Sequence, residues 1–359
     1  MNQKTCKSLA AVGVLLGVVS LPGCVAPTTM QKRVDPGLAA REAEIQRKLA
    51  IEQQYKDYTR VIRVARPLLV ASAEFCGEKV IPSAGVFVAT SLDFEKENQQ
   101  AARDYGLGDL PTVIAVANGS PADVAGLQVG DQLVALDGVP VAAGKKATET
   151  FVGRLRTALK TNGKVALRVQ RSSKEVDLQL GSEMMCDYGV AVSPDETLNA
   201  YADGKNVVIH SGMLRFVESD QELSLILGHE LAHNAMGHIT AKRTNAAIGS
   251  VFDVLAAAYG VNTQGAFGNA GATAYSQAFE SEADYVGMYV LGRAGVPTQG
   301  AANFWRRLGV ASGNIKTSYG ASHPGSAERF VALENAAVEV NQKREAGAPL
   351  VPNPKSKKH

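Results

Sequence analysis

The sequence has few cysteines, almost no excess of charge of either sign and, beyond its N-terminus, no apolar run that could cross a membrane. Its 359 residues include 4 Cys and 1 Trp, and 37 Lys and Arg stand against 35 Asp and Glu. This balance gives no basic surface, so we expect no nucleic-acid partner. With 45% hydrophobic and 20% charged residues, the chain is an ordinary globular one of one large or two modest domains, which disfavours disorder and coiled coil.

The one asymmetry of charge lies at the N-terminus. Two lysines precede an apolar run over residues 9–19, and Leu-Pro-Gly-Cys follows at residues 21–24. This order is typical of a secretory signal with a lipoprotein cleavage site. The alternative, a transmembrane helix, needs about 20 apolar residues and is disfavoured. We expect removal of residues 1–23 and a lipid on Cys24, which would hold the protein at a membrane.

Two other cysteines remain in the exported chain, Cys76 and Cys186. Because an exported protein folds in an oxidising space, we expect them to form a disulfide. The bridge would close a loop of 186 − 76 = 110 residues, and the chain-entropy relation gives such a loop about 4–5 kcal/mol of stabilisation. Two buried free thiols are the alternative.

Sequence patterns divide the rest of the chain into four parts. Residues 24–82 are dominated by helix formers and are predicted to be an N-terminal helical segment. Residues 83–182 alternate β-branched runs with turns, as a small β-rich domain does. Residues 183–342 form a further domain, and residues 343–359 are expected to be a disordered tail.

Residues 119–133 read GSPADVAGLQVGDQL, which closely resembles the bacterial PDZ domain. Such a domain adds an extended peptide to a sheet edge and holds a terminal carboxylate with backbone amides. The resemblance therefore implies a peptide or protein ligand. Residues 106–108 are the candidate carboxylate loop, although residues 85–89 can instead be the first strand. A purely structural PDZ domain is the alternative.

The metal chemistry is predicted from residues 229–233, which read His-Glu-Leu-Ala-His. Ser219, with Glu222 three residues later, forms a capping box that would start a helix here. His229 and His233 are then one turn apart, so both imidazoles can reach one metal ion. Glu230, beside the first imidazole, can point toward a metal-bound water.

The third ligand has to come from elsewhere in the chain. Ile239 stands where a metzincin has its third histidine, so that class is excluded. Glu280 and Asp284 lie one turn apart on a second predicted helix: Glu280 can bind the metal, and Asp284 can orient a ligand imidazole. Other residues near this scheme are expected to be structural or solvated, namely His210, His238 and Glu282.

A series of motifs in this order resembles metallopeptidase family forty-eight, the gluzincins that include the CAAX prenyl proteases, the HtpX-like membrane proteases and periplasmic quality-control proteases. Residues 199–209 resemble the hairpin that precedes the zinc helix of that family. The zinc helix, the helix of Glu280 and residues 293–297 follow, and then Ser-His-Pro at residues 322–324 with Arg329. The resemblance implies an α+β fold, with a mainly helical gluzincin-type zinc peptidase domain, a small edge-strand hairpin and the β-rich PDZ domain.

The resemblance also implies the site. One Zn²⁺ per chain would be held by His229, His233 and Glu280, and Glu230 would be the general base that activates the zinc-bound water. His323, with Arg329, is the candidate for stabilising the oxyanion or for gating the metal. The edge strand expected to hold substrate contains Asn199, Ala200 and Tyr201.

We therefore expect a lipid-anchored zinc endopeptidase of the periplasm that hydrolyses extended or misfolded envelope polypeptides. Val25 after the lipidated cysteine, where Asp would retain the protein at the inner membrane, favours the inner leaflet of the outer membrane. The alternative is a PDZ-bearing chaperone or assembly factor with latent protease activity. A prenyl-peptide processing enzyme finds no support. The apolar residues 246–261 are too few to span a bilayer and are expected to be core or a mobile cover over the cleft.

Overall fold

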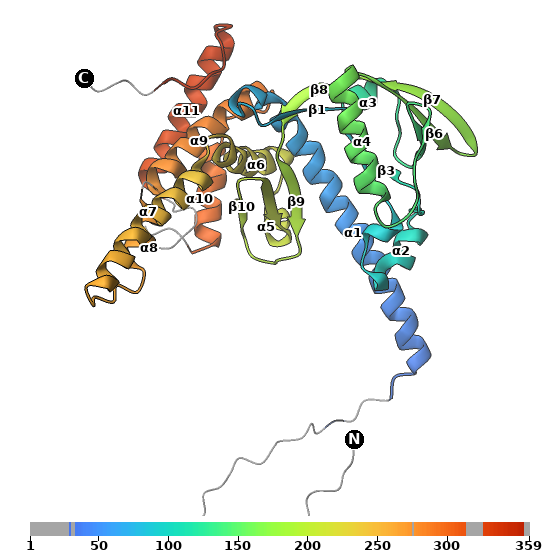
Figure 1. Cartoon of the computed structure of the whole chain (residues 1–359), viewed down its shortest axis with the longest axis horizontal. Coiled ribbons are helices and arrows are strands. Elements are labelled where there is room, and N and C mark those ends of the chain that lie inside the picture. The colour runs from blue at the N-terminus through green and yellow to red at the C-terminus, as the bar shows by residue number, and fades with distance from the viewer. Residues whose placement is uncertain (1–28, 30–32, 275, 314–325, 355–359) are drawn as a thin grey trace, which may run out of the picture. The chain divides into compact units, whose positions relative to one another are not determined.

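The computed structural model describes residues 29, 33–274, 276–313 and 326–354 of the chain (Figure 1). The expected signal peptide at residues 1–23, Cys24 and His323 lie outside these residues. Residues up to Ala43 separate from Glu44–His359 as a unit of their own. The described part of that first unit is mostly the exposed start of helix α1.

The helices are α1 (Pro36–Ala71), α2 (Gln99–Asp104), α3 (Pro121–Val124), α4 (Ala147–Asn162), α5 (Ser211–Phe216), α6 (Asp220–Ala235), α7 (His238–Ala258), α8 (Ala266–Thr273), α9 (Ser276–Arg293), α10 (Ala301–Ala311) and α11 (Ala327–Glu345). The strands are β1 (Val80–Ser83), β2 (Val86–Ala89), β3 (Thr112–Val116), β4 (Gln132–Leu136), β5 (Val139–Pro140), β6 (Val165–Arg171), β7 (Lys174–Leu180), β8 (Glu183–Cys186), β9 (Gly189–Ser193), β10 (Ala200–Ala202) and β11 (Asn206–His210). This mixture confirms the α+β class predicted from the sequence.

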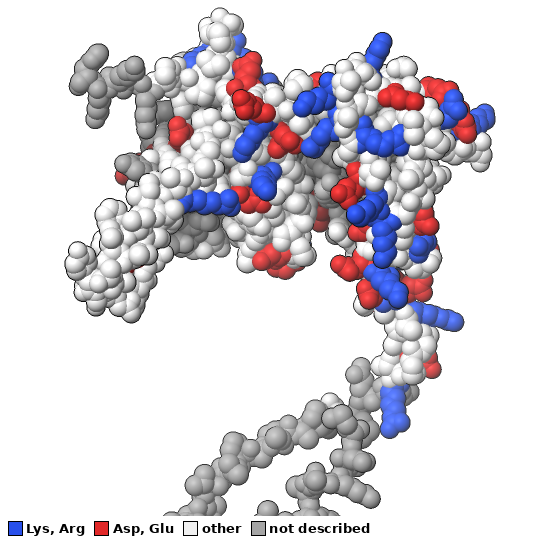
Figure 2. Space-filling model, in the orientation of Figure 1, with Lys and Arg blue, Asp and Glu red and all other residues white. Residues whose placement is uncertain are grey.

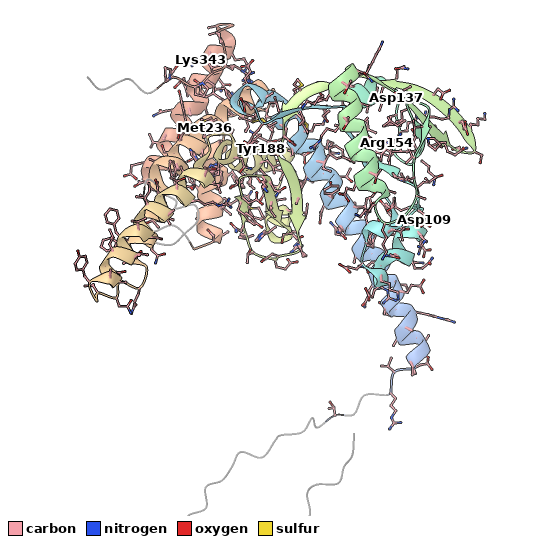
Figure 3. The ribbon with its side chains drawn as sticks, in the orientation of Figure 1. Asp109, Asp137, Arg154, Tyr188, Met236 and Lys343 are labelled. Atoms are coloured by element: carbon pink, nitrogen blue, oxygen red, sulfur yellow. A yellow bond between two sulfur atoms is a disulfide. The ribbon has the colours of Figure 1, made fainter. Side chains whose placement is uncertain are left out.

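The β-rich domain is a sheet of order β2-β3-β4-β6-β7, with β5 paired to β4. Strand β6 buries alternate residues, Val165, Leu167 and Val169, as a strand with one covered face must. Helix α4 covers that face through Phe151 and Leu155. Arg154 of α4 also donates to carbonyl oxygens at the β4–β5 turn, which fixes the helix on the sheet (Figure 3).

Residues 106–108 are not the loop in front of the first strand. The amides of Gly106 and Leu107 donate to carbonyl oxygens of α2, and the Leu107 side chain is buried. These amides close a helix end and are not available to a ligand carboxylate. The first strand of the sheet is instead β2, and the loop before it is residues 84–85.

A disulfide joins Cys76 and Cys186, with Cα atoms 5.7 Å apart. It lies beside a two-stranded ladder in which β1 pairs antiparallel with β8 and Val80 faces Cys186. The ladder and the disulfide together bring the two ends of the β-rich domain side by side.

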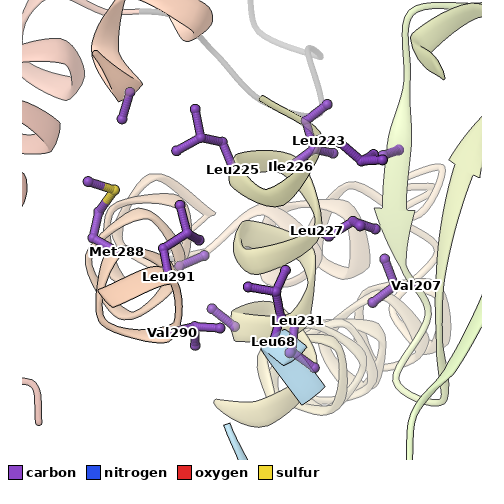
Figure 4. Close-up of a cluster of buried hydrophobic side chains, with 14 of the residues drawn as sticks. Leu68, Val207, Leu223, Leu225, Ile226, Leu227, Leu231, Met288, Val290 and Leu291 are labelled. Carbon is purple, nitrogen blue, oxygen red and sulfur yellow. The ribbon is translucent and has the colours of Figure 1, made fainter. Parts of the chain in front are cut away.

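The second domain is built on the packing of α6 against α9. Helix α6 is buried along nearly all of its length, and its Leu223, Ile226 and Leu231 lie in one cluster with Val290 and Leu291 of α9 (Figure 4). Glycine allows the two backbones to approach closely. A Cβ atom on Gly287 would lie 3.2 Å from the backbone nitrogen of His229 and 3.3 Å from the carbonyl carbon of Gly228.

The structure corrects part of two expectations for the C-terminal half, and a cover over the cleft stays a prediction for residues 246–261. The apolar residues 246–261 are neither core nor buried, since they form the outer half of α7 and the turn after it, with mostly exposed side chains. The described part of the expected disordered tail is held to the body: Leu350 packs against the core, Arg293 donates to its carbonyl oxygen, and Asn353 N donates to Tyr285. Among the described residues, no helix is long and apolar enough to cross a membrane.

Replacing Gly287 by alanine tests the close approach of α6 and α9. The added methyl group meets backbone, which cannot rotate away, so we expect a loss of about 1–3 kcal/mol in the free energy of unfolding. Gly153→Ala in α4 is the control, because nothing lies within 4 Å of a Cβ there and alanine favours a helix over glycine by about 1 kcal/mol. Denaturant titration of both variants measures the difference. Equal stability changes would show that the approach is not tight.

Candidate metal centre

Helix α6 begins where the sequence predicts. The Ser219 side chain accepts a hydrogen bond from Glu222 N at 3.2 Å. The Glu222 carboxylate binds Glu218 N at 2.7 Å instead of closing the capping box. The helix then runs through the core, so His229 and His233 are only 2% and 3% exposed. Burial of two imidazoles requires polar partners on both ring nitrogens.

Three side chains converge at one point inside the domain. The Nε2 atoms of His229 and His233 lie 3.2 Å apart. One Glu280 oxygen lies 3.3 Å from His229 Nε2, and the other lies 3.3 Å from His233 Nε2. Among the described residues, this is the one group of His, Cys, Asp and Glu side chains close enough to hold a metal ion. The expected ligands from α6 and α9 are thus brought together.

The other ring nitrogen of His229 faces Asp284, as expected. Asp284 Oδ1 lies 2.8 Å from His229 Nδ1. Arg329 binds the same carboxylate with Nε at 2.6 Å and Nη2 at 2.8 Å, and its guanidinium lies 4.4 Å above the Trp305 ring. The oxyanion role expected for Arg329 stays a prediction, while its observed contacts hold Asp284, which in turn contacts His229.

The charges of this group reinforce one another. Burial would raise the pKa of Asp284, but Arg329 and His229 hold it below its ordinary value, so the carboxylate stays ionised. Burial would lower the pKa of His229, but Asp284 and Glu280 outweigh it and raise the pKa to about 10. A field that favours a proton on this ring also favours a metal cation at its Nε2 atom.

The outer nitrogen of His233 has a partner that the sequence analysis missed. His238 Nδ1 lies 2.9 Å from His233 Nδ1, and His238 Nε2 lies 2.9 Å from Glu282 Oε2. The ring of His238 is buried and stacks on Phe279 at 4.6 Å. Burial lowers the pKa of His238, a shift that Glu282 opposes. His238 is a structural histidine and Glu282 is exposed, as expected, but both also belong to a hydrogen-bonded chain behind His233 that we did not predict.

The signal for this contact was Gly237. Its φ of 70° ends α6 and starts α7 directly afterwards, so the chain turns back and the first residue of α7 returns to the metal helix. Only the turn at Gly237 shows which way His238 faces.

The strand expected to hold substrate lies at the edge of the sheet β10-β11-β9. Asn234 of α6 fixes its hairpin, since its side chain accepts from Gly204 N at 2.8 Å and donates to Asn206 O at 3.0 Å. Tyr188 (Figure 3) donates to the carbonyl oxygen of Asn234 at 3.0 Å. Asn199 O accepts from His210 N, Ala200 is buried and Tyr201 is exposed. The metal helix therefore positions the edge strand.

Comparisons with known proteins agree with this architecture. The sequence model of Peptidase family M48 matches residues 160–337, and that of the PDZ domain matches residues 112–171. Metalloprotease YcaL of Escherichia coli (strain K12) is 34% identical over 151 residues, which are 40% of this chain and 59% of that protein. The Beta-barrel assembly-enhancing protease of Yersinia pestis is 29% identical over 129 residues, 32% of this chain and 26% of that protein.

The chain thus covers less than two thirds of the length of these relatives. Among solved structures, the HtrA3 PDZ domain bound to a phage-derived ligand matches with 20% identity and a TM-score of 0.23, over 30% of this chain and 88% of that one. Through residues 160–337 the chain belongs to peptidase family M48, and through residues 112–171 it carries a PDZ domain.

Proposed function

We propose that the protein is a zinc-dependent endopeptidase. The observation that carries this proposal is the convergence of three side chains: the two Nε2 atoms lie 3.2 Å apart, and each lies 3.3 Å from a different oxygen of Glu280. Atoms bound 2.0–2.1 Å from a tetrahedral ion are about 3.3 Å apart, which is the arrangement that zinc requires. Two histidines and a carboxylate also leave a fourth position open, as hydrolytic zinc sites do and structural ones do not.

Glu230 is the proposed general base. It follows His229 directly on α6 and is buried, so its carboxylate lies in the same water-poor interior as the ligands. Zinc, when bound, lowers the pKa of a water molecule and polarises the scissile carbonyl. Glu230 would take the proton of that water and deliver it to the leaving amine nitrogen.

The hydrogen bonds behind the ligands fix their tautomers. With Nε2 of each ligand histidine facing the metal, Nδ1 must carry a proton and donate. His229 then donates to Asp284, and His233 donates to His238, whose own Nε2–H donates to Glu282. Such outer partners orient the rings and increase their basicity.

The edge strand β10 is the proposed docking strand for substrate. Its ladder with β11 has hydrogen bonds from His210 N to Asn199 O and from Asp203 N to Asn206 O. Because bonding alternates along an antiparallel ladder, Tyr201 also faces β11, and the backbone groups of Ala200 and Ala202 face outward. A substrate would add there as a strand. Because this binding uses main-chain hydrogen bonds, it favours extended or misfolded polypeptides.

The PDZ domain is the proposed second polypeptide site. Strand β2 is an edge strand, and a pocket lies between it and α4. The pocket is also lined by Ser83 at the end of β1, by the loop of residues 84–85 and by Arg66. Arg66 is buried and forms an ion pair with Glu183, while its Nε has no hydrogen-bond partner among the described residues. A buried donor of this kind is suited to a terminal carboxylate.

We further propose a lipid-anchored protein of the periplasm, attached through Cys24 to the outer membrane. The Cys76–Cys186 disulfide supports an oxidising compartment. The relative named Beta-barrel assembly-enhancing protease supports an envelope role. The proposed substrates are therefore unfolded envelope polypeptides.

The Glu230→Gln variant tests the peptidase. The amide keeps the shape of the carboxylate but cannot accept the proton, so we expect cleavage of unfolded casein to fall by about 100-fold or more at equal zinc content. Gel-resolved time courses and metal analysis measure both quantities. Equal cleavage by both proteins would contradict the role of Glu230. Absence of cleavage by the zinc-loaded wild type, with casein still bound, would favour the chaperone.

Removal of the partner of His233 tests the hydrogen-bonded chain. His238→Ala and Glu282→Gln are expected to weaken zinc binding by about 10–100-fold, measured by competition with a chromogenic chelator. His210→Ala is the control, since His210 is also buried but binds Thr197. Its zinc affinity should match that of the wild type. A weakening by all three variants alike would point to general loss of structure.

Binding of C-terminal peptides tests the PDZ site. We expect the wild type to prefer apolar peptides with a free C-terminus over their amidated forms, and Arg66→Gln to reduce this preference about tenfold, since charged hydrogen bonds contribute roughly 1.5–3 kcal/mol. Lys56→Gln on the same helix is the control, because Lys56 is exposed and pairs with Glu52. Fluorescence polarisation measures the affinities. An unchanged preference in Arg66→Gln would exclude this carboxylate site.

A further inference from the structure

Helices α7 and α8 form a hairpin with almost no charge. Between Arg243 and Glu280 the sequence has one charged residue, Asp253. In Figure 2 the hairpin shows no basic or acidic surface from its outer half to its tip. Eight large apolar side chains of this segment are between 47% and 87% exposed: Ile248, Val251, Phe252, Val254, Leu255, Tyr259, Val261 and Phe267. Monomeric soluble proteins rarely expose so continuous an apolar surface without a function.

In this hairpin small residues lie between the helices, and the large apolar side chains face outward. Its two helices touch through glycines: a Cβ on Gly249 would overlap the carbonyl oxygen of Phe267, and one on Gly271 would overlap that of Asn245. Because the interior has no room for large side chains, these point outward. Small residues between helices and large apolar residues outside are the pattern of helices in lipid, where backbones approach closely and side chains meet acyl chains.

The backbone at the tip is satisfied from within. The amides of Tyr259, Gly260 and Val261 donate to the last carbonyl oxygens of α7. Asp253 accepts from the Thr263 hydroxyl and from the amides of Phe267 and Gly268. The one carboxylate of the segment is thus used to close the turn. An element that enters an apolar phase must satisfy its backbone groups in this way.

We propose that the α7–α8 hairpin is a membrane-docking element that inserts its apolar side chains into the interfacial region of a phospholipid bilayer. Apolar side chains on both helices and at the tip suit a fluid phase that covers all sides, whereas a protein partner covers one face. The nearest charges on the N-terminal side are cationic, Lys242 and Arg243, and suit anionic headgroups. Since no described helix can span a membrane, the hairpin enters one leaflet only.

The docking element is joined directly to the metal centre. Helix α7 begins at His238, which contacts the ligand His233, and continues without a break to Ala258. At 1.5 Å per residue, this helix holds the tip about 30 Å from the centre. Docking would therefore set the height of the site above the bilayer. The proposal rests on the surface of the hairpin alone and does not depend on the proposed catalysis.

Tryptophan placed on the hairpin tests insertion directly. Val254→Trp puts the probe at a 69% exposed position of α7, and Val310→Trp puts it at a 65% exposed position of α10 as the matched control. Both proteins keep Trp305, which is buried, and both keep Cys24. Each full chain is mixed with vesicles of phosphatidylglycerol and phosphatidylcholine whose acyl chains carry bromine, a contact quencher.

We expect the emission of Val254→Trp to shift to the blue and to fall by about twofold, with Val310→Trp unchanged, because only the hairpin reaches the acyl chains. Adding Phe252→Glu to the hairpin probe should abolish the quenching, and circular dichroism checks that this exposed substitution leaves the fold intact. Equal quenching of both probes, or of neither, would overturn the proposal. A blue shift caused by unfolded casein or by protein concentration alone, without bromine quenching, would instead assign the surface to a polypeptide or to a second copy.

Discussion

The close crossing of α6 and α9 is the constraint on which the metal centre depends. Two ligands come from one helix and the third from the other, and a carboxylate side chain is short. The histidine Nε2 atoms come within 3.3 Å of the Glu280 oxygens only if the two backbones nearly touch. Gly228 and Gly287 allow this contact, since each lies against the backbone or a side chain of the other helix. The site is therefore a property of the core, whose rigidity keeps the ligands in place.

Burial of the ligands then dictates much of the surrounding structure. Each imidazole needs a partner for its outer nitrogen, because an unpaired polar group in this interior costs several kcal/mol. Asp284 meets this need for one ring and is itself held by Arg329 of α11, which stacks on Trp305 of α10. His238 of α7 meets it for the other ring. The positions of α7, α10 and α11 are thus linked to the hydrogen-bond partners that the Nδ1 atoms of His229 and His233 require.

These dependences explain how far the sequence could predict the protein. Spacing and capping were enough to predict the helix of His229 and His233, and alternation was enough to predict the PDZ strands, because both are local patterns. The one-turn spacing of Glu280 and Asp284 indicated both residues, and the family resemblance supported them. His238 and Glu282 escaped prediction because their contact depends on the turn at Gly237 and on how α7 lies against α9. The exposure of the apolar residues of α7 was not predicted for another reason. Their composition indicates burial, but glycines occupy the interface between α7 and α8, so the larger side chains face outward.

The disulfide has a mechanical consequence. Cys76 precedes the first strand of the ladder and Cys186 ends the second, so the PDZ sheet lies wholly within the loop that the bridge closes. A pulling force applied to α1 passes from Cys76 to Cys186 through sulfur and enters the peptidase core at once. The PDZ domain is a side branch of this covalent path, although α1 also packs on it through Ile51 and Tyr55. Tension on the N-terminal segment therefore reaches the peptidase domain through the disulfide. A distortion of the PDZ sheet reaches it through the peptide chain instead.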